Sequence, residues 1–336
     1  MRAISVKDGR GPASAMFIDD SFPDPVVRND RILVQIKAFG LNRMDIWQRQ
    51  ANYPYKLPEE THGNTMGVEF SGVVLDLGPE CSSGKFHVGD RVFGLVYGGA
   101  YAERLTISEK MLMHLPPELS FEEGAGIPET FFTASQAINL VGSIPPNANV
   151  LIHAGASGVG QSAIQVAHLA GAKKIFATAG SPQKCDLARS LGADFAINYR
   201  AGEDFAEVVE RETDGHGVDL IVDLIGTDYW EGNVKSAAVD SRIVVIALMS
   251  GSKIPNFDMR PLLTKRVWIC TTTLRVRQPE YQVKVKDFFV EKILPALAER
   301  KIKTVIDKVY SWSQIRDAHE RMEANQNAGK LICTVD

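Results

Sequence analysis

Cysteine is scarce in this sequence, and its four residues are widely separated. Cys81, Cys185, Cys270 and Cys333 form no pair at short spacing, so they give no sign of a disulfide framework. Scattered, unpaired cysteine is typical of a protein kept in a reducing compartment. We therefore expect a cytoplasmic protein.

Long apolar runs and an excess of positive charge are missing as well. No segment approaches the roughly 20 apolar residues that a membrane helix needs, and the opening MRAISVKDGRGP lacks the apolar core of a secretion signal. The net charge is −4, with no basic face, so we expect neither nucleic acid nor membrane as a partner. The 336 residues, 45% of them hydrophobic, are enough for two domains with well-filled cores.

The hydrophobic pattern changes twice along the chain. Residues 1–125 contain short β-like runs separated by Gly, Pro and Asp, which predict a β-rich domain shaped as a distorted barrel. Residues 126–271 alternate short apolar strands with helices, including a helix over 129–141 and a strand over 242–250. That alternation predicts right-handed βαβ units and a parallel sheet. Residues 272–336 predict helices and a closing strand that return to the first domain. The predicted fold class is α/β: a doubly wound parallel sheet plus a β-rich domain.

The stretch LIHAGASGVGQSA, residues 151–163, runs from a strand into a glycine-rich turn. It is one residue away from a nucleoside-triphosphate loop, but Gln161 stands where that loop needs a lysine to reach the phosphates. A dinucleotide loop needs no lysine, because backbone N–H groups and the helix N-terminus bind the pyrophosphate. The alternative is a glycine turn that binds nothing; its place in the first complete βαβ unit favours the dinucleotide loop. The candidate cofactor-binding residues of this turn are Gly155, Ser157, Gly158, Val159 and Gly160.

The end of the next strand predicts which dinucleotide is bound. NAD-binding loops carry an acidic residue there, which bonds the ribose 2′-hydroxyl. The sequence reads ATAGSPQK instead, with no acid to repel a 2′-phosphate, and with Ser181 and Lys184 able to bond and neutralise one. The alternative is that Lys184 and Arg200 are ordinary surface charges. We expect NADPH as the cofactor, with Gly180, Ser181, Lys184 and Tyr199 among its binding residues.

Several segments together carry a family resemblance over essentially the whole chain: GLNRMDIWQRQANYP, GVEFSGVVLDLG, HAGASGVG and AHERMEANQNAGKLI. They resemble the zinc-free quinone oxidoreductase branch of the medium-chain dehydrogenase/reductase superfamily, which includes zeta-crystallin. The similarity is greatest to its tumour-suppressor-inducible subgroup, which also has Ser in the glycine loop. The resemblance implies a GroES-like domain with a Rossmann domain. It also implies a homodimer formed by the last strands of the cofactor domain, within RIVVIALMSG to VWICTTTL.

The resemblance makes the missing zinc ligands informative. Zinc-dependent relatives use a Cys near the first helix, a His in G-H-E and a later Cys or carboxylate. Here Asn42 and Asp45 occupy the first region and Val68 replaces the histidine, and a lobe of four closely spaced cysteines is absent. The seven histidines include no H-x-x-x-H pair, and we expect His153 to be packed or hydrogen-bonded. We therefore expect no metal.

The remaining residues limit the chemistry. None of the eight tyrosines has a lysine four positions on, so the Tyr-x-x-x-Lys route to alcohol dehydrogenation is missing as well as zinc. A quinone is already electrophilic, so positioning it against the nicotinamide provides most of the catalysis. An α,β-unsaturated carbonyl is the next candidate. Three functions stay open: an NADPH-dependent quinone reductase, an NADPH-dependent enone or enoyl reductase, and a non-enzymatic NADPH binder, structural or RNA-associated, as some zeta-crystallin relatives suggest.

Carried over residue by residue, the resemblance implies the site. Asn42 resembles the family's asparagine on the nicotinamide side, and Tyr53 resembles the tyrosine next to cofactor and substrate. Asp45 lies on the same helix as Asn42, and these three are the catalytic candidates. The alternatives are that Asp45 only caps or pairs locally and that Tyr53 is an ordinary half-buried aromatic. Further cofactor-binding candidates are Thr133, Leu248, Met249, Leu274, Arg275, Asn325 and Lys330.

Overall fold

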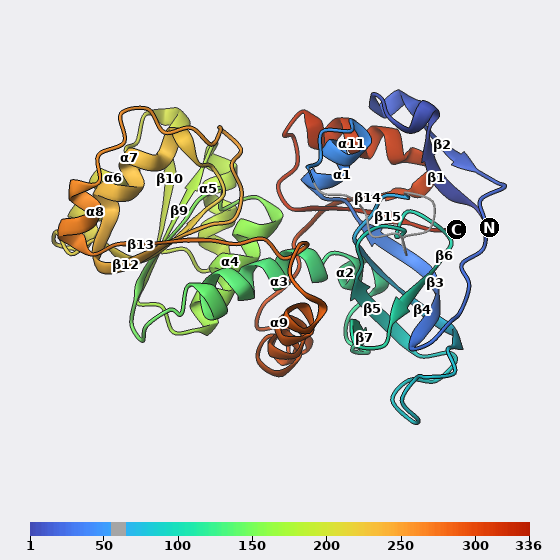
Figure 1. Cartoon of the computed structure of the whole chain (residues 1–336). Helices are drawn as coiled ribbons and strands as arrows, with labels where there is room; N and C mark the ends of the chain where they lie inside the picture. The colour runs from blue at the N-terminus through green and yellow to red at the C-terminus, as the bar shows by residue number, and fades with distance from the viewer. Residues whose placement is uncertain (55–64) are drawn as a thin grey trace. The chain divides into compact units, whose positions relative to one another are not determined.

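A computed structural model describes residues 1–54 and 65–336, and these form two compact units. Unit 1 comprises Met1–Thr130 and Gln278–Asp336, and unit 2 comprises Phe131–Arg277. Unit 2 is therefore inserted into unit 1 along the chain, with boundaries slightly later than the predicted 125/126 and 271/272. Figure 1 labels many of the elements of both units. Within the described part of the chain, no helix combines the length and apolar content that crossing a membrane requires.

Unit 1 is built on a seven-stranded sheet. Its order is β14-β15-β3-β4-β5-β7, and β6 also pairs with β3. Strand β15 pairs antiparallel with β3, with Ile332 opposite Gly40, and parallel with β14. The C-terminal segment therefore adds two strands to a sheet that the N-terminal part begins. The strands are β3 (Arg31–Gly40), β4 (Glu69–Leu77), β5 (Arg91–Leu95), β6 (Arg104–Ser108), β7 (Leu112–His114), β14 (Ile306–Ser311) and β15 (Lys330–Thr334); β1 (Ala3–Val6) and β2 (Met16–Asp19) form a separate pair.

The sequence of β3 explains which of its faces is buried. Ile32, Val34 and Ile36 alternate with more exposed residues and are buried, because successive side chains point to opposite faces of a strand. The other elements of unit 1 are helices and 3₁₀ turns: α1 (Arg43–Arg49), α2 (Phe121–Ala125), α9 (Pro279–Lys292), α10 (Leu294–Ala298), α11 (Ile315–Glu323), and the 3₁₀ turns η1 (Lys7–Gly9), η2 (Ala13–Ala15) and η7 (Trp312–Gln314).

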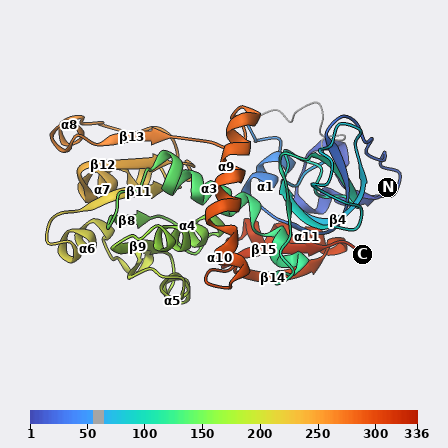
Figure 2. The same ribbon diagram turned by 90° about the horizontal axis from the view of Figure 1, so that it is seen from below.

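Unit 2 is a parallel sheet of six strands in the order β10-β9-β8-β11-β12-β13. Figure 2 shows β9, β8, β11, β12 and β13 following one another in this order. The strand order reverses between β8 and β11, and ligands of such sheets bind at the carboxyl ends of the strands beside that switch point. The strands are β8 (Asn149–Ile152), β9 (Lys174–Ala179), β10 (Phe195–Asn198), β11 (Val218–Asp223), β12 (Ala237–Val245) and β13 (Trp268–Thr271). The helices are α3 (Pro128–Ser135), η4 (Gln136–Val141), α4 (Gly158–Leu169), α5 (Pro182–Ser190), α6 (Phe205–Glu212), α7 (Trp230–Ser236) and α8 (Arg260–Lys265), with 3₁₀ turns η5 (Tyr199–Ala201) and η6 (Thr227–Tyr229).

The core of unit 2 lies between this sheet and its helices. Leu151, Phe176, Ile221 and Ile243 come from four strands and are buried in one cluster with residues of α6. Such continuous apolar strands are typical of a parallel sheet that is covered on both faces. The fold class predicted from the sequence is confirmed.

Two predicted elements differ in detail. The helix expected over 129–141 is α-helical only to Ser135 and continues as the π-helix η4. The strand expected over 242–250 begins earlier, at Ala237, and ends at Val245. The apolar residues that follow leave the sheet because their backbone bonds the segment after β11, where Gly226 and Gly251 form an isolated bridge.

Candidate functional site

The glycine-rich turn lies where β8 ends and α4 begins. Ser157 is the N-cap of α4, and its Oγ accepts a hydrogen bond from the Gly160 N–H at 3.1 Å. The Gly155 N–H donates to the carbonyl oxygen of Thr178 at 2.8 Å, which ties the turn to β9. A Cβ at Gly160 would collide with the carbonyl of Ala154, so the helix can approach the turn this closely only with glycine there. The turn is tight, and it presents the N-terminal end of a 12-residue helix.

A buried polar network supports this turn from behind. His153 lies 2.6 Å through Nε2 from Oδ1 of Asn233 and 3.2 Å through Nδ1 from Oγ1 of Thr178. The same Thr178 hydroxyl accepts a hydrogen bond from the Ala154 N–H at 3.2 Å. Burial lowers the pKa of His153 to about 4, so the ring is neutral at pH 7. The expectation that His153 is packed and hydrogen-bonded is confirmed, whereas the parts played by Thr178 and Asn233 were not predicted.

The end of β9 brings the predicted 2′-phosphate residues together. Ser181 is the N-cap of α5, and its Oγ accepts a hydrogen bond from the Lys184 N–H at 3.3 Å. A Cβ on Gly180 would lie 2.6 Å from the hydroxyl of Tyr199, which is 43% exposed. Tyr229 was not predicted; its ring centre lies 6.2 Å from that of Tyr199. These residues follow three strands of unit 2 and line one rim at their carboxyl ends.

The other candidates of unit 2 follow strands of the same sheet or lie on α3. Leu248 and Met249 come after β12 and are each 50% exposed, in a segment whose backbone bonds the residues after β11. Leu274 and Arg275 come after β13, with Leu274 buried and Arg275 half-buried. Thr133 is half-buried on α3, and Val159 lies in the first turn of α4. The structure therefore places the loops after β8, β9, β12 and β13 at one edge of the sheet.

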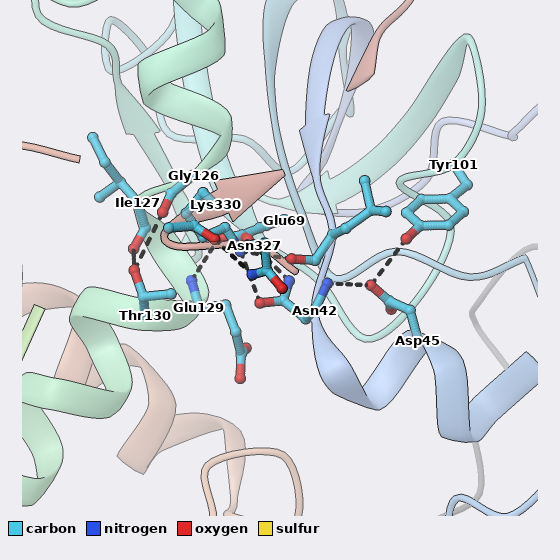
Figure 3. Close-up of polar contacts among 12 residues, drawn as sticks. Asn42, Asp45, Glu69, Tyr101, Gly126, Ile127, Glu129, Thr130, Asn327 and Lys330 are labelled. Atoms are coloured by element: carbon cyan, nitrogen blue, oxygen red, sulfur yellow. Dashed lines mark hydrogen bonds and ion pairs between the residues drawn. The ribbon is translucent and has the colours of Figure 1, made fainter. Parts of the chain in front are cut away.

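In unit 1, Asn42 joins a buried ion pair (Figure 3). Its Nδ2 donates to Oε1 of Glu69 at 2.9 Å, and its Oδ1 accepts from Nζ of Lys330 at 2.9 Å. Lys330 also forms an ion pair with Glu69 and donates to the Leu41 carbonyl at 2.9 Å. The second oxygen of Glu69 accepts from the Glu129 N–H at 2.9 Å. All three donors of the ammonium group are directed at protein acceptors, so Lys330 holds Asn42 and has no donor left for a ligand in this arrangement.

Asp45 lies on the other side of Asn42. Its Oδ2 accepts hydrogen bonds from the Asn42 N–H at 2.8 Å and from the Tyr101 hydroxyl at 3.0 Å (Figure 3). Burial raises the pKa of Asp45 to about 6, against the opposing effect of these two hydrogen bonds and of the charge of Lys330. The local capping role that was an alternative for Asp45 is therefore present. Tyr101 was not predicted, and its sequence position gives no signal of this contact.

The two remaining candidates of unit 1 lie near the ends of helices. Tyr53 is half-buried shortly after α1, next to residues 55–64, which lie outside the described part of the chain. Asn325 follows α11 with a left-handed φ of 53°, and its Oδ1 accepts a hydrogen bond from Arg43 at 2.6 Å. Asn325 thereby ties the end of α11 to the start of α1.

The described residues around Asn42 and Val68 do not fit a catalytic zinc ion. Val68 is buried where a histidine ligand would be needed, and Glu69 is occupied by Lys330 and Asn42. Among residues 1–54 and 65–336, no three His, Cys, Asp or Glu side chains are grouped so as to hold a metal. One of the seven histidines, His62, lies outside those residues. Around Asn42, the described side chains of Glu69 and Lys330 supply carboxylate oxygens and an ammonium group, not the sulfur and imidazole ligands typical of a tetrahedral zinc site.

Two regions of the chain match known protein families. Residues 28–117 match the alcohol dehydrogenase GroES-like domain, and residues 158–291 match the zinc-binding dehydrogenase family. A curated relative, quinone oxidoreductase-like protein 2 of Bos taurus, is 30% identical over 323 residues, which cover 95% of this chain and 89% of that protein.

Solved structures agree over the whole chain. An NAD-dependent alcohol dehydrogenase superposes with a TM-score of 0.87 at 30% identity, covering 100% of both chains. The quinone oxidoreductase of Pseudomonas syringae pv. Tomato DC3000 gives 0.84 at 28% identity and 99% of both chains. The CurK enoyl reductase gives 0.84 at 27% identity, covering 100% of this chain and 99% of the other.

Proposed function

The chain belongs to the medium-chain dehydrogenase/reductase superfamily of nicotinamide-dependent oxidoreductases, and on that premise we propose that it is an NADPH-dependent quinone oxidoreductase that needs no metal. The proposal rests on a contrast between the two units: unit 2 has a glycine-rich turn between β8 and α4 that fits a dinucleotide, while unit 1 has Val68 where zinc-dependent relatives have a histidine ligand. The first feature supports hydride chemistry from a nicotinamide. The second limits the acceptor to a compound that needs no Lewis acid.

The residues of unit 2 fit a dinucleotide. The turn from Gly155 to Gly160 and the N-terminal end of α4 would hold the pyrophosphate with backbone N–H groups. Ser181 and Lys184, at the start of α5, would bond and neutralise a 2′-phosphate, and no acidic residue stands between β9 and α5 to repel it. We therefore propose NADPH over NADH. When bound, the nicotinamide supplies the hydride.

The acceptor follows from what unit 1 offers. Asn42 is held by hydrogen bonds to Glu69 and Lys330, so its amide is a rigid group for orienting a ligand. Tyr53 has a phenolic hydroxyl that would donate a hydrogen bond to a quinone oxygen as charge develops there. In the net reaction the quinone takes up one hydride and one proton and becomes a hydroquinone, while NADPH becomes NADP⁺. Neither group needs to be the obligate proton source, because a hydroquinone oxygen exchanges protons with water.

An enone reductase is the second candidate, since the CurK enoyl reductase superposes on this chain as well as the quinone oxidoreductase does. An enone needs a proton at the carbon α to the carbonyl after hydride addition. Water would have to reach that carbon, or a side chain would have to donate there. This requirement makes the enone the more demanding acceptor.

The test compares acceptors and cofactors with the purified protein. We expect steady NADPH oxidation with a quinone that persists after exhaustive chelation, slower oxidation with an enone, and none coupled to a primary alcohol. Binding of NADPH and NADH is measured separately by calorimetry. Tight NADPH binding without turnover on any acceptor would favour the non-enzymatic alternative. Activity that chelation removes and zinc restores would contradict the metal-free proposal.

We also propose that the protein is a homodimer. Strand β13 is one of the two outer strands of the sheet in unit 2, and it carries the exposed apolar residues Trp268 and Ile269. The N–H and C=O groups on the open side of such a strand form a template that a second strand covers. A second copy of the chain would pair with β13 across a two-fold axis.

A further inference from the structure

A buried row of four side chains connects α1 with α11 in unit 1. The Tyr101 hydroxyl lies 3.0 Å from Oδ2 of Asp45 and 3.2 Å from Nε2 of His319. The other ring nitrogen of His319, Nδ1, lies 3.1 Å from Nη1 of Arg49. Each of the four residues is at most 1% exposed. At its far end Arg49 forms an ion pair with Glu323, which is partly exposed. The row therefore reaches from the candidate site toward the surface without a water-accessible member.

Elementary chemistry fixes where the protons of this row lie. The guanidinium of Arg49 can only donate, so Nδ1 of His319 accepts and carries no proton. Burial lowers the pKa of His319 to about 3, and the charge of Arg49 acts in the same direction, so the ring is neutral. Its proton is therefore on Nε2, which donates to the oxygen of Tyr101. The hydroxyl proton of Tyr101 is left to donate to Asp45. Every hydrogen bond of the row points toward Asp45, starting from Arg49.

The row ends on a carboxylate oxygen that accepts twice. Oδ2 of Asp45 accepts from Tyr101 and from the Asn42 N–H, whereas Oδ1 is buried with no hydrogen-bond partner. Asn42 is the N-cap of α1, and its side chain meets Glu69 and Lys330 on the opposite side (Figure 3). Asp45 therefore holds the backbone of Asn42 at the start of α1, while Glu69 and Lys330 bond its side-chain amide.

We propose that Arg49, His319 and Tyr101 are positioning residues, which hold Asp45 as a double hydrogen-bond acceptor and thereby orient Asn42 for the reduction. The proposal rests on the proposed function, because the orientation of Asn42 affects turnover only if Asn42 contacts the reacting molecules. The row is not a proton wire. If His319 gave up its Nε2 proton it would become an imidazolate, because Nδ1 faces Arg49 and cannot take up a proton from that side. The row therefore orients Asp45 without delivering protons to it.

A pH signature follows from the groups that face Asp45. These are the Asn42 N–H and the Tyr101 hydroxyl, which bond it, and the charges of Lys330 on β15 and Glu69 on β4, which oppose each other. His319 and Arg49 stand behind Tyr101. The hydrogen bond from Tyr101 lowers the pKa of Asp45, which burial has raised to about 6. The Tyr101→Phe variant removes that hydrogen bond, so Asp45 takes up its proton at a higher pH. As the pH falls, the hydrogen bond from the Asn42 N–H to the Asp45 carboxylate is then weakened at a higher pH than in the wild type.

The first test needs no activity. Nitrogen NMR of protein with labelled histidine, with His319 assigned from a His319→Gln variant, distinguishes the two tautomers and the charged ring. We expect His319 to be neutral with its proton on Nε2 between about pH 5 and 8. A proton on Nδ1, or a doubly protonated ring in that range, would overturn the proposed direction of the row.

The second test is kinetic and uses whichever acceptor, quinone or enone, the wild type reduces. We expect Tyr101→Phe to lower kcat about tenfold at pH 7, to change KM for NADPH less than about twofold, and to move the acidic midpoint of kcat to higher pH. The control is Tyr310→Phe, since Tyr310 is also a buried tyrosine of unit 1 but lies on β14 outside the row. Identical pH profiles for the two variants would overturn the proposal.

Different results would contradict the proposed function and the proposed positioning role of the row. If the wild type reduces no acceptor, the proposed function is wrong, and the side-chain amide resonance of Asn42 then decides the positioning role. That resonance should shift in Tyr101→Phe and stay in place in Tyr310→Phe. An unchanged Asn42 resonance in Tyr101→Phe would show that the row does not position Asn42.

Discussion

Lys330 and Glu69 form an ion pair in which both side chains are buried: the lysine side chain is 5% exposed and the glutamate side chain 0%. They come from β15 and β4, which lie on either side of β3 in the sheet of unit 1. Burying two charges carries a large desolvation penalty, which is offset here because every N–H of the ammonium and both oxygens of the carboxylate are hydrogen-bonded. The interactions within the pair therefore offset the desolvation penalty only while both residues are present, and the loss of either one should destabilise the fold.

Removing one member of this pair should be worse than removing both charges. Lys330→Met leaves the Glu69 carboxylate buried without its counter-charge, and we expect the free energy of unfolding to fall by about 3–5 kcal/mol. In the double variant Lys330→Met with Glu69→Gln, no unpaired charge remains, and the loss should be smaller. Urea unfolding of the three proteins measures both values. A double variant less stable than the single one would contradict this account.

Lys184 should discriminate between the two cofactors. If it neutralises a 2′-phosphate, Lys184→Ala weakens NADPH binding and leaves NADH binding almost unchanged. A charge contact at such a half-buried position contributes about 1 kcal/mol, which corresponds to roughly fivefold in Kd. Calorimetric titration of both cofactors checks this, with the exposed Arg200→Ala variant as the comparison for a charge at the same rim. Equal weakening of NADPH and NADH would show that Lys184 acts on the turn rather than on the phosphate.

Tyr53 should contribute through positioning and one hydrogen bond. We expect Tyr53→Phe to lower quinone turnover about tenfold or less, roughly 1.4 kcal/mol, because the hydroquinone oxygen can take its proton from water. Tyr53→Ala should cost more, since the ring itself is lost. Steady-state kinetics with saturating NADPH measures both. A loss of a thousandfold or so in the Phe variant would identify Tyr53 as an essential proton donor.

The protein should lose stability as the pH falls from about 6.5 to about 4, in part because of His153. Burial lowers the pKa of His153 to about 4 in the folded state, whereas an unfolded histidine titrates near 6.5. In this window the unfolded state binds more protons, so the free energy of unfolding decreases toward acid by about 1.4 kcal/mol per pH unit, and by about 3 kcal/mol in total.

The variant His153→Gln isolates this contribution, because glutamine takes up no proton. Asp45 acts in the opposite sense: its pKa is raised to about 6, so between about pH 4 and 6 the folded state binds its proton preferentially. The contributions of Asp45 and His319 are common to wild type and variant and cancel in the difference. Urea unfolding of both proteins between about pH 4 and 7 should show the shallower dependence in His153→Gln. Parallel curves would contradict the assignment.

The proposed dimer makes a prediction at β13. We expect light scattering to give about twice the chain mass of 36.9 kDa for the wild type and a monomer for Ile269→Lys. A lysine on an edge strand opposes pairing with a second strand. The comparison variant is Val309→Lys, since Val309 is an exposed apolar residue on β14 of unit 1. A wild type that stays monomeric at micromolar concentration would contradict the dimer.

Local sequence carried enough information to predict the turn between β8 and α4 and the start of α5. Gly155, Ser157 and Gly160 lie within one turn, and the hydrogen bonds that shape the turn link residues a few positions apart. The N-cap role of Ser181 is equally local. Such motifs are legible in a single sequence because the interactions that form them are short in sequence.

The interior of unit 1 could not be predicted in the same way. Tyr101 bonds His319 across 218 positions, and Lys330 bonds Glu69 across 261. No periodicity or spacing encodes such contacts, since they arise only when the sheet and α11 pack. Asn42, Asp45 and Lys330 were identified through the family resemblance, but their mutual contacts were not. Leu248 and Met249 show that a local pattern can also mislead. Their apolar run predicts a strand to residue 250, but β12 ends at Val245.

The place of β15 between β14 and β3 has a consequence for how the protein is made. A ribosome releases residues 131–277 before it has made β14, β15 or Lys330, so unit 2 can fold while the sheet of unit 1 is still incomplete. Until β15 is made, Glu69 has no ammonium to pair with, and residues 38–40 of β3 lack a partner strand that another nascent chain could replace. The ion pair beside Asn42 therefore forms only after unit 2 has been made, and β15 both completes that pair and covers one end of β3.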